Sequence, residues 1–215
     1  MTAAAFTGRA SDAERAIRMA VVAKIRELRP EARIIHELNV EAGMYRADLA
    51  AVEPGRITLF EIKSHKDTLD RVDDQMIAFQ RVAHQAVLVA DLKWFDTTPY
   101  IGGQPRLVWP CQGLWTGVWC YPEPKPLGPS HMQYVWTLRE PGMRQPAPRK
   151  LLELCWRDEL YAECRRKGLP VKARSTAAYM VDLMAFEMTG REIVEAVCRR
   201  LRARTFVTAD PAVPV

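Results

Sequence analysis

The sequence contains no apolar run long enough to cross a bilayer, and its first residues lack the basic and apolar regions of a secretory signal peptide. We therefore expect a cytoplasmic protein with no membrane partner. Its five cysteines are an odd number without CxxC or Cys/His ligand spacing, so neither a disulfide framework nor a zinc site is predicted. We expect reduced, mostly buried thiols.

Two further kinds of catalytic side chain lack the partners they would need. The four histidines show no His-x-x-x-His or other ligand-pair spacing, so most are expected to be structural or surface groups. No basic partner is suggested for Ser64 or Ser175, which gives little weight to a serine nucleophile. With 48% hydrophobic and 27% charged residues, the composition is globular and argues against a disordered or fibrous chain.

The basic excess is confined to one part of the chain. Residues 1–138 hold 16 Lys and Arg against 16 Asp and Glu, whereas residues 139–204 hold 15 against 9. The net charge of +5 therefore arises in the C-terminal third, where we expect a partner that carries many negative charges. Charge alone leaves nucleic acid, acidic protein and lipid open.

Helical and extended patterns alternate in the N-terminal part. Ser11 and Glu14 have the spacing of a capping box in front of an amphipathic helix that stops before Pro30. Three β-rich runs follow, IIHELNV, YRADLAAV and RITLFEIK, and a Glu-Pro-Gly turn between the last two predicts a hairpin. A helical period then begins at Asp67, and AVLVA, from Ala86, is typical of a strand buried on both faces.

This order, α-β-β-β-α-β, predicts an α/β fold of the α+β type, with a small mixed sheet flanked by helices over residues 1–92. Residues 93–148 are rich in Pro, Gly and Trp, with one predicted strand at GVWCY. They could extend the sheet, form a substrate-facing loop region or link two units. Residues 149–204 return to helical patterns, with breaks near Gly168 and Gly190, and residues 205–215 are predicted to be a frayed tail.

The hairpin brings together residues with chemistry. Glu61 and Lys63 point to one side of their strand, because residues two apart share a face. If Pro54 and Gly55 are the turn residues, the register places Asp48 directly opposite Glu61. Two facing carboxylates with Cβ atoms roughly 5 Å apart repel, and a divalent cation between them would remove that repulsion.

Such an arrangement suits phosphodiester hydrolysis. Carboxylate oxygens hold Mg²⁺ or Mn²⁺, which binds the scissile phosphate and lowers the pKa of a bound water. The ammonium of Lys63 would stabilise the negative charge that develops in the transition state. The alternative interpretation of Asp48, Glu61 and Lys63 is a solvated strand face with a surface ion pair.

Asp48 followed by Glu61-Ile62-Lys63 resembles the core of the PD-(D/E)XK nuclease superfamily, and FEIKSHKDTLDR is similar to bacterial and phage members with an EIKS-x-KDTLDR signature. The resemblance covers roughly residues 8–92 and implies a restriction-endonuclease-like αβββαβ core. Ala47 stands where the superfamily's leading proline would be. The resemblance implies catalytic roles for Asp48, Glu61 and Lys63.

The same resemblance suggests further site residues. It implies that Asp48, Glu61 and the backbone carbonyl of Ile62 bind the metal, with Glu14 and Glu37 as additional candidate ligands. Gln75 is a candidate supporting residue, similar to the glutamine of a QxxxY motif. Each of these three side chains also has a simpler interpretation: a helix cap for Glu14, a polar edge-strand residue for Glu37 and a solvated helix position for Gln75.

The C-terminal helical segment, ELYAECRRKGLPVKARSTAAYMVDLM, resembles the SAP motif, a pair of helices that binds DNA. Basic side chains around its central break would neutralise phosphates without selecting a base sequence. The alternative is an ordinary helical hairpin with a solvated basic face. The candidate nucleic-acid-binding residues are Arg165, Arg166, Lys167, Lys172 and Arg174.

These features together predict a metal-dependent DNA nuclease with a core over residues 1–92 and a basic helical module over residues 149–204. DNA repair, recombination and phage DNA processing are the expected contexts. A homodimer stays open, because many nucleases of this superfamily act as dimers. The leading alternative is a catalytically inactive DNA-binding or adaptor protein that keeps the fold, and a basic protein-interaction module is a more distant one.

Overall fold

The computed structural model describes residues 11–96, 106–107, 117–124, 136–138 and 145–214. Cys111 and His131, together with most of residues 97–144, lie outside the described residues. Four cysteines within them are free and buried, as expected. Within the same ranges, no helix combines the length and the apolar character needed to cross a bilayer.

The N-terminal part has the predicted order of helices and strands. It consists of α1 (Asp12–Leu28), β1 (Arg33–Val40), η1 (Glu41–Gly43), β2 (Tyr45–Glu53), β3 (Arg56–Lys63), α2 (Val72–Val82), β4 (Gln85–Asp91), η2 (Leu92–Trp94) and β5 (Phe95–Asp96). The rest consists of β6 (Arg106–Leu107), β7 (Gly117–Tyr121), α3 (Pro148–Leu152), α4 (Arg157–Lys167), α5 (Ala177–Glu187) and α6 (Gly190–Ala203).

Five strands form one mixed sheet in the order β1-β2-β3-β4-β7, and β5 pairs with β6 in a separate two-stranded sheet. Strand β2 is antiparallel to both of its neighbours, β1 and β3, whereas β4 and β7 continue from β3 in parallel. The predicted fold class, a mixed α+β sheet flanked by helices, is confirmed.

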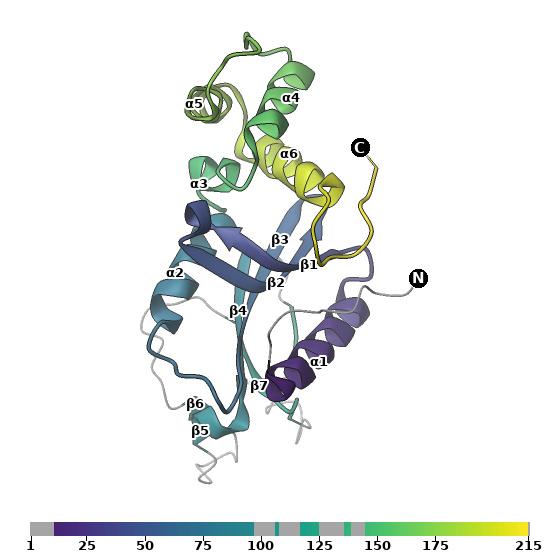
Figure 1. The fold of residues 1–215 in the computed structure, drawn as a ribbon, viewed down its shortest axis with the longest axis vertical. Coiled ribbons are helices and arrows are strands. Elements are labelled where there is room, and N and C mark those ends of the chain that lie inside the picture. The colour runs from purple at the N-terminus through teal and green to yellow at the C-terminus, as the bar shows by residue number, and fades with distance from the viewer. Residues whose placement is uncertain (1–10, 97–105, 108–116, 125–135, 139–144, 215) are drawn as a thin grey trace.

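The sheet separates two hydrophobic layers (Figure 1). On one face α1 packs through Ile17, Val21 and Ile25 against strand residues that include Phe60 and Trp119. On the other face α2 packs against a different set of strand residues. The interior strand β4 contributes to both layers, which explains why AVLVA is apolar at every position.

Local sequence explains where α1 begins and ends. The hydroxyl of Ser11 accepts a hydrogen bond from the backbone N–H of Glu14, which caps the first turn. The reciprocal half of the predicted capping box is absent from the described contacts of Glu14, because its carboxylate binds Arg18 instead. The helix ends at Leu28, two residues before Pro30, as predicted.

Two predicted helix boundaries are wrong, and each has a local cause. The helix expected from Asp67 begins only at Val72, because Asp67 first closes a turn by accepting bonds from the N–H and hydroxyl of Ser64. The helix expected as one unit after Pro148 divides into α3 and α4. There Glu159 caps a new helix start by accepting from the N–H of Trp156.

The described part of residues 93–148 extends the sheet, since the predicted strand GVWCY is β7 and pairs with β4. The indole rings of Trp119 and Trp136 stack with centroids 5.0 Å apart, and both belong to the hydrophobic layer under α1. Trp136 also donates to the backbone carbonyl of Cys120 at 2.9 Å. Aromatic packing therefore holds this end of the sheet.

The C-terminal helices lie at the top of Figure 1, where α6 packs against β2 and β3. Buried residues of α3, α4, α5 and α6 join one continuous hydrophobic cluster with α2 and the strands. Arg33 of β1 reinforces this contact by donating to the backbone carbonyls of Leu201, Arg202 and Arg204. The same hydrophobic cluster therefore stabilises the sheet and holds the C-terminal helices against it.

The prediction of a frayed tail over residues 205–215 is wrong for the part that the structure describes. Ala209 forms a β-bridge with Ile35, and the carboxylate of Asp210 accepts from the N–H of Ile34 at 2.7 Å. The side chains of Arg26 and Arg33 also bind Asp210. Backbone pairing and the carboxylate of Asp210 together hold the segment along β1.

Candidate active site

Three acidic residues lie in one row across three neighbouring strands: Glu37 on β1, Asp48 on β2 and Glu61 on β3. The row follows from the register, because Leu49 pairs with His36 on one side and with Phe60 on the other. The predicted hairpin register is therefore confirmed. Its ladder ends at Leu49 and Phe60, however, one residue before Asp48 and Glu61.

The backbone is distorted at this row. Glu37 has a φ of 58°, a left-handed conformation that costs a side-chain-bearing residue roughly 1–3 kcal/mol. Side chains form the contacts that a regular ladder would supply. The carboxylate of Asp48 accepts from the N–H of Ile62 at 2.7 Å, and the carbonyl of Asp48 accepts from Arg18 at 2.6 Å. Strain and interrupted pairing of this kind are common at functional sites.

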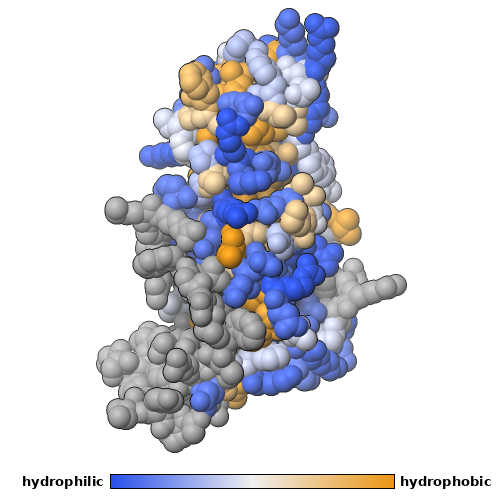
Figure 2. Space-filling model, turned by 90° about the vertical axis from the view of Figure 1, so that its left-hand side faces the viewer, coloured by the Kyte–Doolittle hydropathy of each residue, from blue (hydrophilic) through white to orange (hydrophobic). Residues whose placement is uncertain are grey.

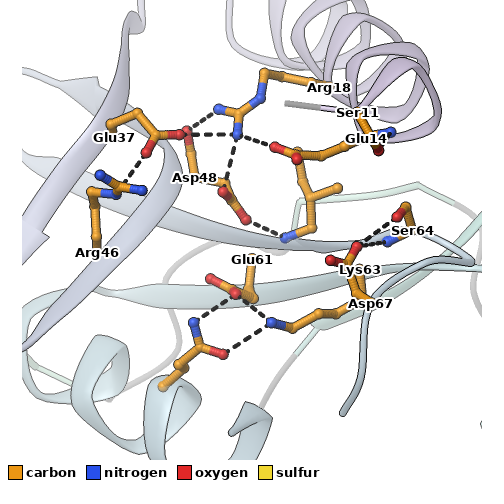
Figure 3. Close-up of polar contacts among 12 residues, drawn as sticks. Ser11, Glu14, Arg18, Glu37, Arg46, Asp48, Glu61, Lys63, Ser64 and Asp67 are labelled. Atoms are coloured by element: carbon orange, nitrogen blue, oxygen red, sulfur yellow. Dashed lines mark hydrogen bonds and ion pairs between the residues drawn. The ribbon is translucent and has the colours of Figure 1, made fainter. Parts of the chain in front are cut away.

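Arg18 of α1 occupies the centre of the acidic cluster (Figure 3). Its Nη2 atom lies 2.7 Å from Oε1 of Glu14, 3.0 Å from Oε1 of Glu37 and 3.0 Å from Oδ1 of Asp48. Arg18 is only 2% exposed. Arg46 adds a second guanidinium on the outer side, with Nε 2.6 Å from Oε2 of Glu37. The structure thus brings both additional candidate ligands to the site, but it places them on an arginine.

Glu61 faces the other side of the row, where Lys63 and Gln75 bind it. Gln75 of α2 donates to Oε1 of Glu61 at 2.6 Å, and Nζ of Lys63 lies 2.8 Å from the same oxygen. Lys63 also donates to the amide oxygen of Gln75 at 3.1 Å. Gln75, Lys63 and Glu61 thus contact one another in a closed triangle, so Gln75 is not simply a solvated helix position. Figure 3 shows Glu61 and Lys63 side by side.

The second oxygen of Glu61, Oε2, is buried and has no hydrogen-bond partner among the described residues. Glu61 as a whole is 3% exposed, which excludes a solvated strand face for this residue. Leaving a charged oxygen buried and unsatisfied costs several kcal/mol in general. A cation or an ordered water at this oxygen would remove that cost.

The raised pKa values of Asp48 and Glu61 also indicate that too little positive charge surrounds these two carboxylates. Burial, followed by repulsion from Glu61, raises the pKa of Asp48 to about 8, even though Arg18 acts in the opposite direction. Burial likewise raises the pKa of Glu61, despite its contacts with Lys63 and Gln75. Perturbed carboxyl groups of this kind are frequent in active sites, although structural networks produce them too.

A divalent cation fits the space between Asp48 and Glu61 on chemical grounds. The unpaired Oε2 of Glu61 is a hard oxygen ligand, each oxygen of Asp48 has a further lone pair, and the carbonyl of Ile62 is adjacent in sequence. Within the described ranges, no three His, Cys, Asp or Glu side chains converge as a metal cluster. Mg²⁺ needs no such cluster, because it usually keeps several water ligands.

The segment after Lys63 is held by contacts that sequence reasoning missed. Asp67 binds the N–H and hydroxyl of Ser64, and the indole of Trp94 donates to the carbonyl of Ser64 at 3.1 Å. Lys93 donates to the carbonyl of His65 and lies over the ring of Trp94. The SHKD run therefore fixes the end of β3 directly after Lys63.

Arg18 lies at the centre of the site but was not among the residues predicted from the sequence, although the sequence contains a signal for it. Arg18 lies four residues after Glu14 and three before Val21, so it shares a helix face with a candidate ligand and with core residues. A charged residue on a buried helix face requires a partner. The carboxylates predicted on the neighbouring strands are the candidate partners of Arg18.

The candidate DNA-binding residues of the C-terminal helices are all exposed, but they differ in their contacts. Arg166 binds Glu163 and Lys167 binds Glu192, whereas Lys172 and Arg174 line a hollow of about 390 Å³ with Ser175 and other residues of the α4–α5 loop. On the face drawn in Figure 2, hydrophilic and hydrophobic residues are interspersed over these helices. The basic surface is thus a local patch.

The fold and this centre define a mixed α/β protein with a row of three carboxylates at the open end of its central hairpin, of which Glu61 is buried and Glu37 and Asp48 are partly exposed. A family model described as Bacteriophage P4 protein cII matches residues 9–99. The matched stretch is less than half of the chain, and it contains Glu14, Glu37, Asp48, Glu61 and Lys63. Over this stretch the chain is similar to that phage family. No curated protein and no solved structure matches the chain.

Proposed function

We propose that the protein is a divalent-metal-dependent nuclease that hydrolyses phosphodiester bonds in DNA, with its centre at Asp48, Glu61 and Lys63. The observation that carries the proposal is the buried, unpaired Oε2 of Glu61 next to Asp48, whose pKa is raised to about 8. One cation would bind Oε2 of Glu61 and would offset the repulsion that helps to raise the pKa of Asp48. The αβββαβ order and the EIK tripeptide support the same interpretation through their resemblance to PD-(D/E)XK nucleases.

Each side chain has a distinct role in this proposal. Asp48, Glu61 and the carbonyl of Ile62 hold Mg²⁺ or Mn²⁺, which supplies a Lewis acid for the phosphate and an activated water. Nζ of Lys63 lies 2.8 Å from Oε1 of Glu61, where its positive charge would meet the phosphate. Gln75 fixes the relative position of Glu61 and Lys63 by binding both.

DNA is the favoured substrate for two reasons. The excess of basic residues lies in the C-terminal third, where Lys172 and Arg174 line an open hollow suited to a phosphate group. The similarity of residues 9–99 to a phage protein family supports a role in phage DNA processing, with repair and recombination as related contexts. A homodimer is compatible with this function.

One observation favours the alternative of an inactive DNA-binding protein. Arg18 binds three carboxylates that could otherwise serve as metal ligands, which reduces the oxygen ligands left for a metal. The two functions differ in whether DNA is cleaved in the presence of metal.

The test is incubation of supercoiled, linear, single-stranded and branched DNA with the protein in Mg²⁺, Mn²⁺ or EDTA. We expect cleavage of at least one substrate with metal and none in EDTA. Glu61→Gln should abolish it, while Glu53→Gln, at the turn end of the same hairpin and 22% exposed in its side chain, should cleave normally. DNA binding without cleavage in every metal would support the inactive alternative.

A further inference from the structure

A single nitrogen of Arg18 contacts three carboxylates, which do not converge as a metal cluster within the described residues while the guanidinium lies between them. Its Nη2 lies within 3.0 Å of one oxygen each from Glu14, Glu37 and Asp48. This nitrogen carries only two hydrogens, so it cannot donate a well-aligned bond to all three oxygens. A spherical charge has no such restriction, and the geometry is that of a cation position filled by a guanidinium.

The three carboxylates come from three different elements, which excludes a local side-chain pair as the explanation. Glu14 lies on α1, Glu37 on β1 and Asp48 on β2. Glu37 reaches this position through a left-handed backbone conformation that L-residues rarely adopt. The fold thus accepts strain to bring three negative charges around one buried positive charge.

We infer that Arg18 is a positioning residue that takes the place of a second divalent cation, so that the centre holds one metal ion and not two. The inference rests on the proposed function for the first ion, between Asp48 and Glu61. A centre with one metal ion requires that one end of the carboxylate row lacks a cation and that the other end already has one. Oε2 of Glu61 lacks a partner in the part of the chain that the structure describes, whereas Oδ1 of Asp48 is already bound to a positive charge.

Arg18 also orients the carboxylate that the metal would share. It contacts Asp48 twice, with Nη1 2.6 Å from the backbone carbonyl and Nη2 3.0 Å from Oδ1. The other oxygen, Oδ2, is thereby directed to the N–H of Ile62, on the strand that carries Glu61. A guanidinium keeps its positive charge at ordinary pH. Arg18 therefore orients the carboxylate of Asp48 whether or not a metal ion is bound.

The test is the number of Ca²⁺ ions that bind, measured by calorimetry on wild type, Arg18→Ala and Arg18→Lys. Ca²⁺ suits the cluster because its oxygen ligands lie at about 2.3–2.6 Å, only slightly closer than these oxygens lie to Nη2. We expect one ion for wild type, two for Arg18→Ala and one for Arg18→Lys, since the ammonium restores the charge. Glu37→Gln added to Arg18→Ala should remove the extra ion and leave the first.

Arg15→Ala is the matched control, because Arg15 lies on the same helix but is exposed and pairs only loosely with Asp12 at 3.6 Å. It should bind the same number of ions as wild type. A folded Arg18→Ala that gains no ion would overturn the inference. So would an Arg18→Ala that stays unfolded at millimolar Ca²⁺, since the guanidinium would then be a structural requirement that no cation replaces.

Failure of the proposed function would give a different pattern. If wild type binds no Ca²⁺ and Arg18→Ala binds one, the centre between Asp48 and Glu61 is not a metal site, while Arg18 still occupies a cation position. If wild type binds one ion and Arg18→Ala also binds one, the proposed metal site stands and the role given to Arg18 is wrong.

Discussion

The molecule contains two buried charge clusters of opposite composition. In the core, one arginine, Arg18, is surrounded by three carboxylates. In the C-terminal helices, one glutamate, Glu163, is surrounded by three arginines, and Glu163 is 1% exposed. These arginines are Arg166, Arg199 and Arg200, with nitrogens 2.6–3.0 Å from the carboxylate.

The two clusters differ in whether their buried charge is satisfied. Burial alone would raise the pKa of Glu163, but hydrogen bonds from Arg199 and Arg166 and the charge of Arg200 lower it below its usual value. In the core, burial raises the pKa of both Asp48 and Glu61. The helical cluster is therefore complete without a ligand, whereas the core cluster is short of positive charge. This contrast separates a structural ion network from a candidate centre.

The largest expected effect is on cleavage by Lys63→Met. The ammonium stabilises the transition state while the carboxylates hold the metal, so the rate should fall by about two to three orders of magnitude and metal affinity should persist. Single-turnover cleavage of a labelled substrate and calorimetry measure the two quantities separately. Arg199→Met, at the helical cluster, is the control and should keep the cleavage rate. Loss of metal together with activity would instead make Lys63 a structural support of Glu61.

The same substitution at the two buried glutamates should change stability in opposite directions. Glu163→Gln leaves three arginines around a neutral side chain, and removing one partner of a buried ion network costs about 3–5 kcal/mol. Glu61→Gln removes a charge that burial already disfavours, so the free energy of unfolding in EDTA should stay level or rise. Urea denaturation in EDTA measures both. Equal destabilisation by the two variants would remove the distinction between the clusters.

A smaller effect is expected on the pH dependence of stability. Asp48 has a folded-state pKa of about 8 against an ordinary value of 3.8, so between these values the folded state binds more protons than the unfolded state. This contribution to stability is complete below about pH 4 and is lost as the pH rises through 8. In EDTA, melting temperatures of wild type should therefore fall more steeply over this range than those of Asp48→Asn. A saturating divalent cation should remove the difference.

Sequence patterns predicted what depends on local periodicity and turn chemistry. The alternation of apolar residues and the Pro54-Gly55 turn were sufficient for the strand order and for the register that brings Asp48 towards Glu61. The tripeptide at Glu61 and Lys63 gave the nearest neighbours in the site, because residues two apart on a strand share a face. These relations involve residues close in sequence or joined by one tight turn.

What the sequence did not predict depends on contacts between distant elements. The insertion of Arg18 among the strand carboxylates depends on how α1 packs across the sheet, and no periodicity specifies that position. Likewise, Asp210 looked like part of a polar tail, but it binds Arg26 and Arg33, which lie more than 170 residues earlier. A charged residue shows its need for a partner in the sequence, while the identity of that partner is a property of the fold.

The basic patch of the helical module allows the last and smallest test. Deleting residues 149–215 would be a poor experiment, because α3 and α6 share the hydrophobic core with the sheet and Arg33 binds the end of α6. Point substitutions avoid this problem. Lys172 and Arg174 line the hollow of the α4–α5 loop and are exposed, so their removal should leave the fold intact.

The double variant Lys172→Ala/Arg174→Ala should weaken DNA binding and lower the slope of log affinity against log salt by about 2, since each lost phosphate contact contributes about 0.9. Arg149→Ala/Arg191→Ala removes the same charge from elsewhere in the helical module, on α3 and α6, but these arginines pair with Asp182 and Glu195. A smaller change in the control would place the phosphate contacts in the hollow. Equal slopes for both variants would show that only net charge matters, and an unchanged slope in both would put the DNA elsewhere on the protein.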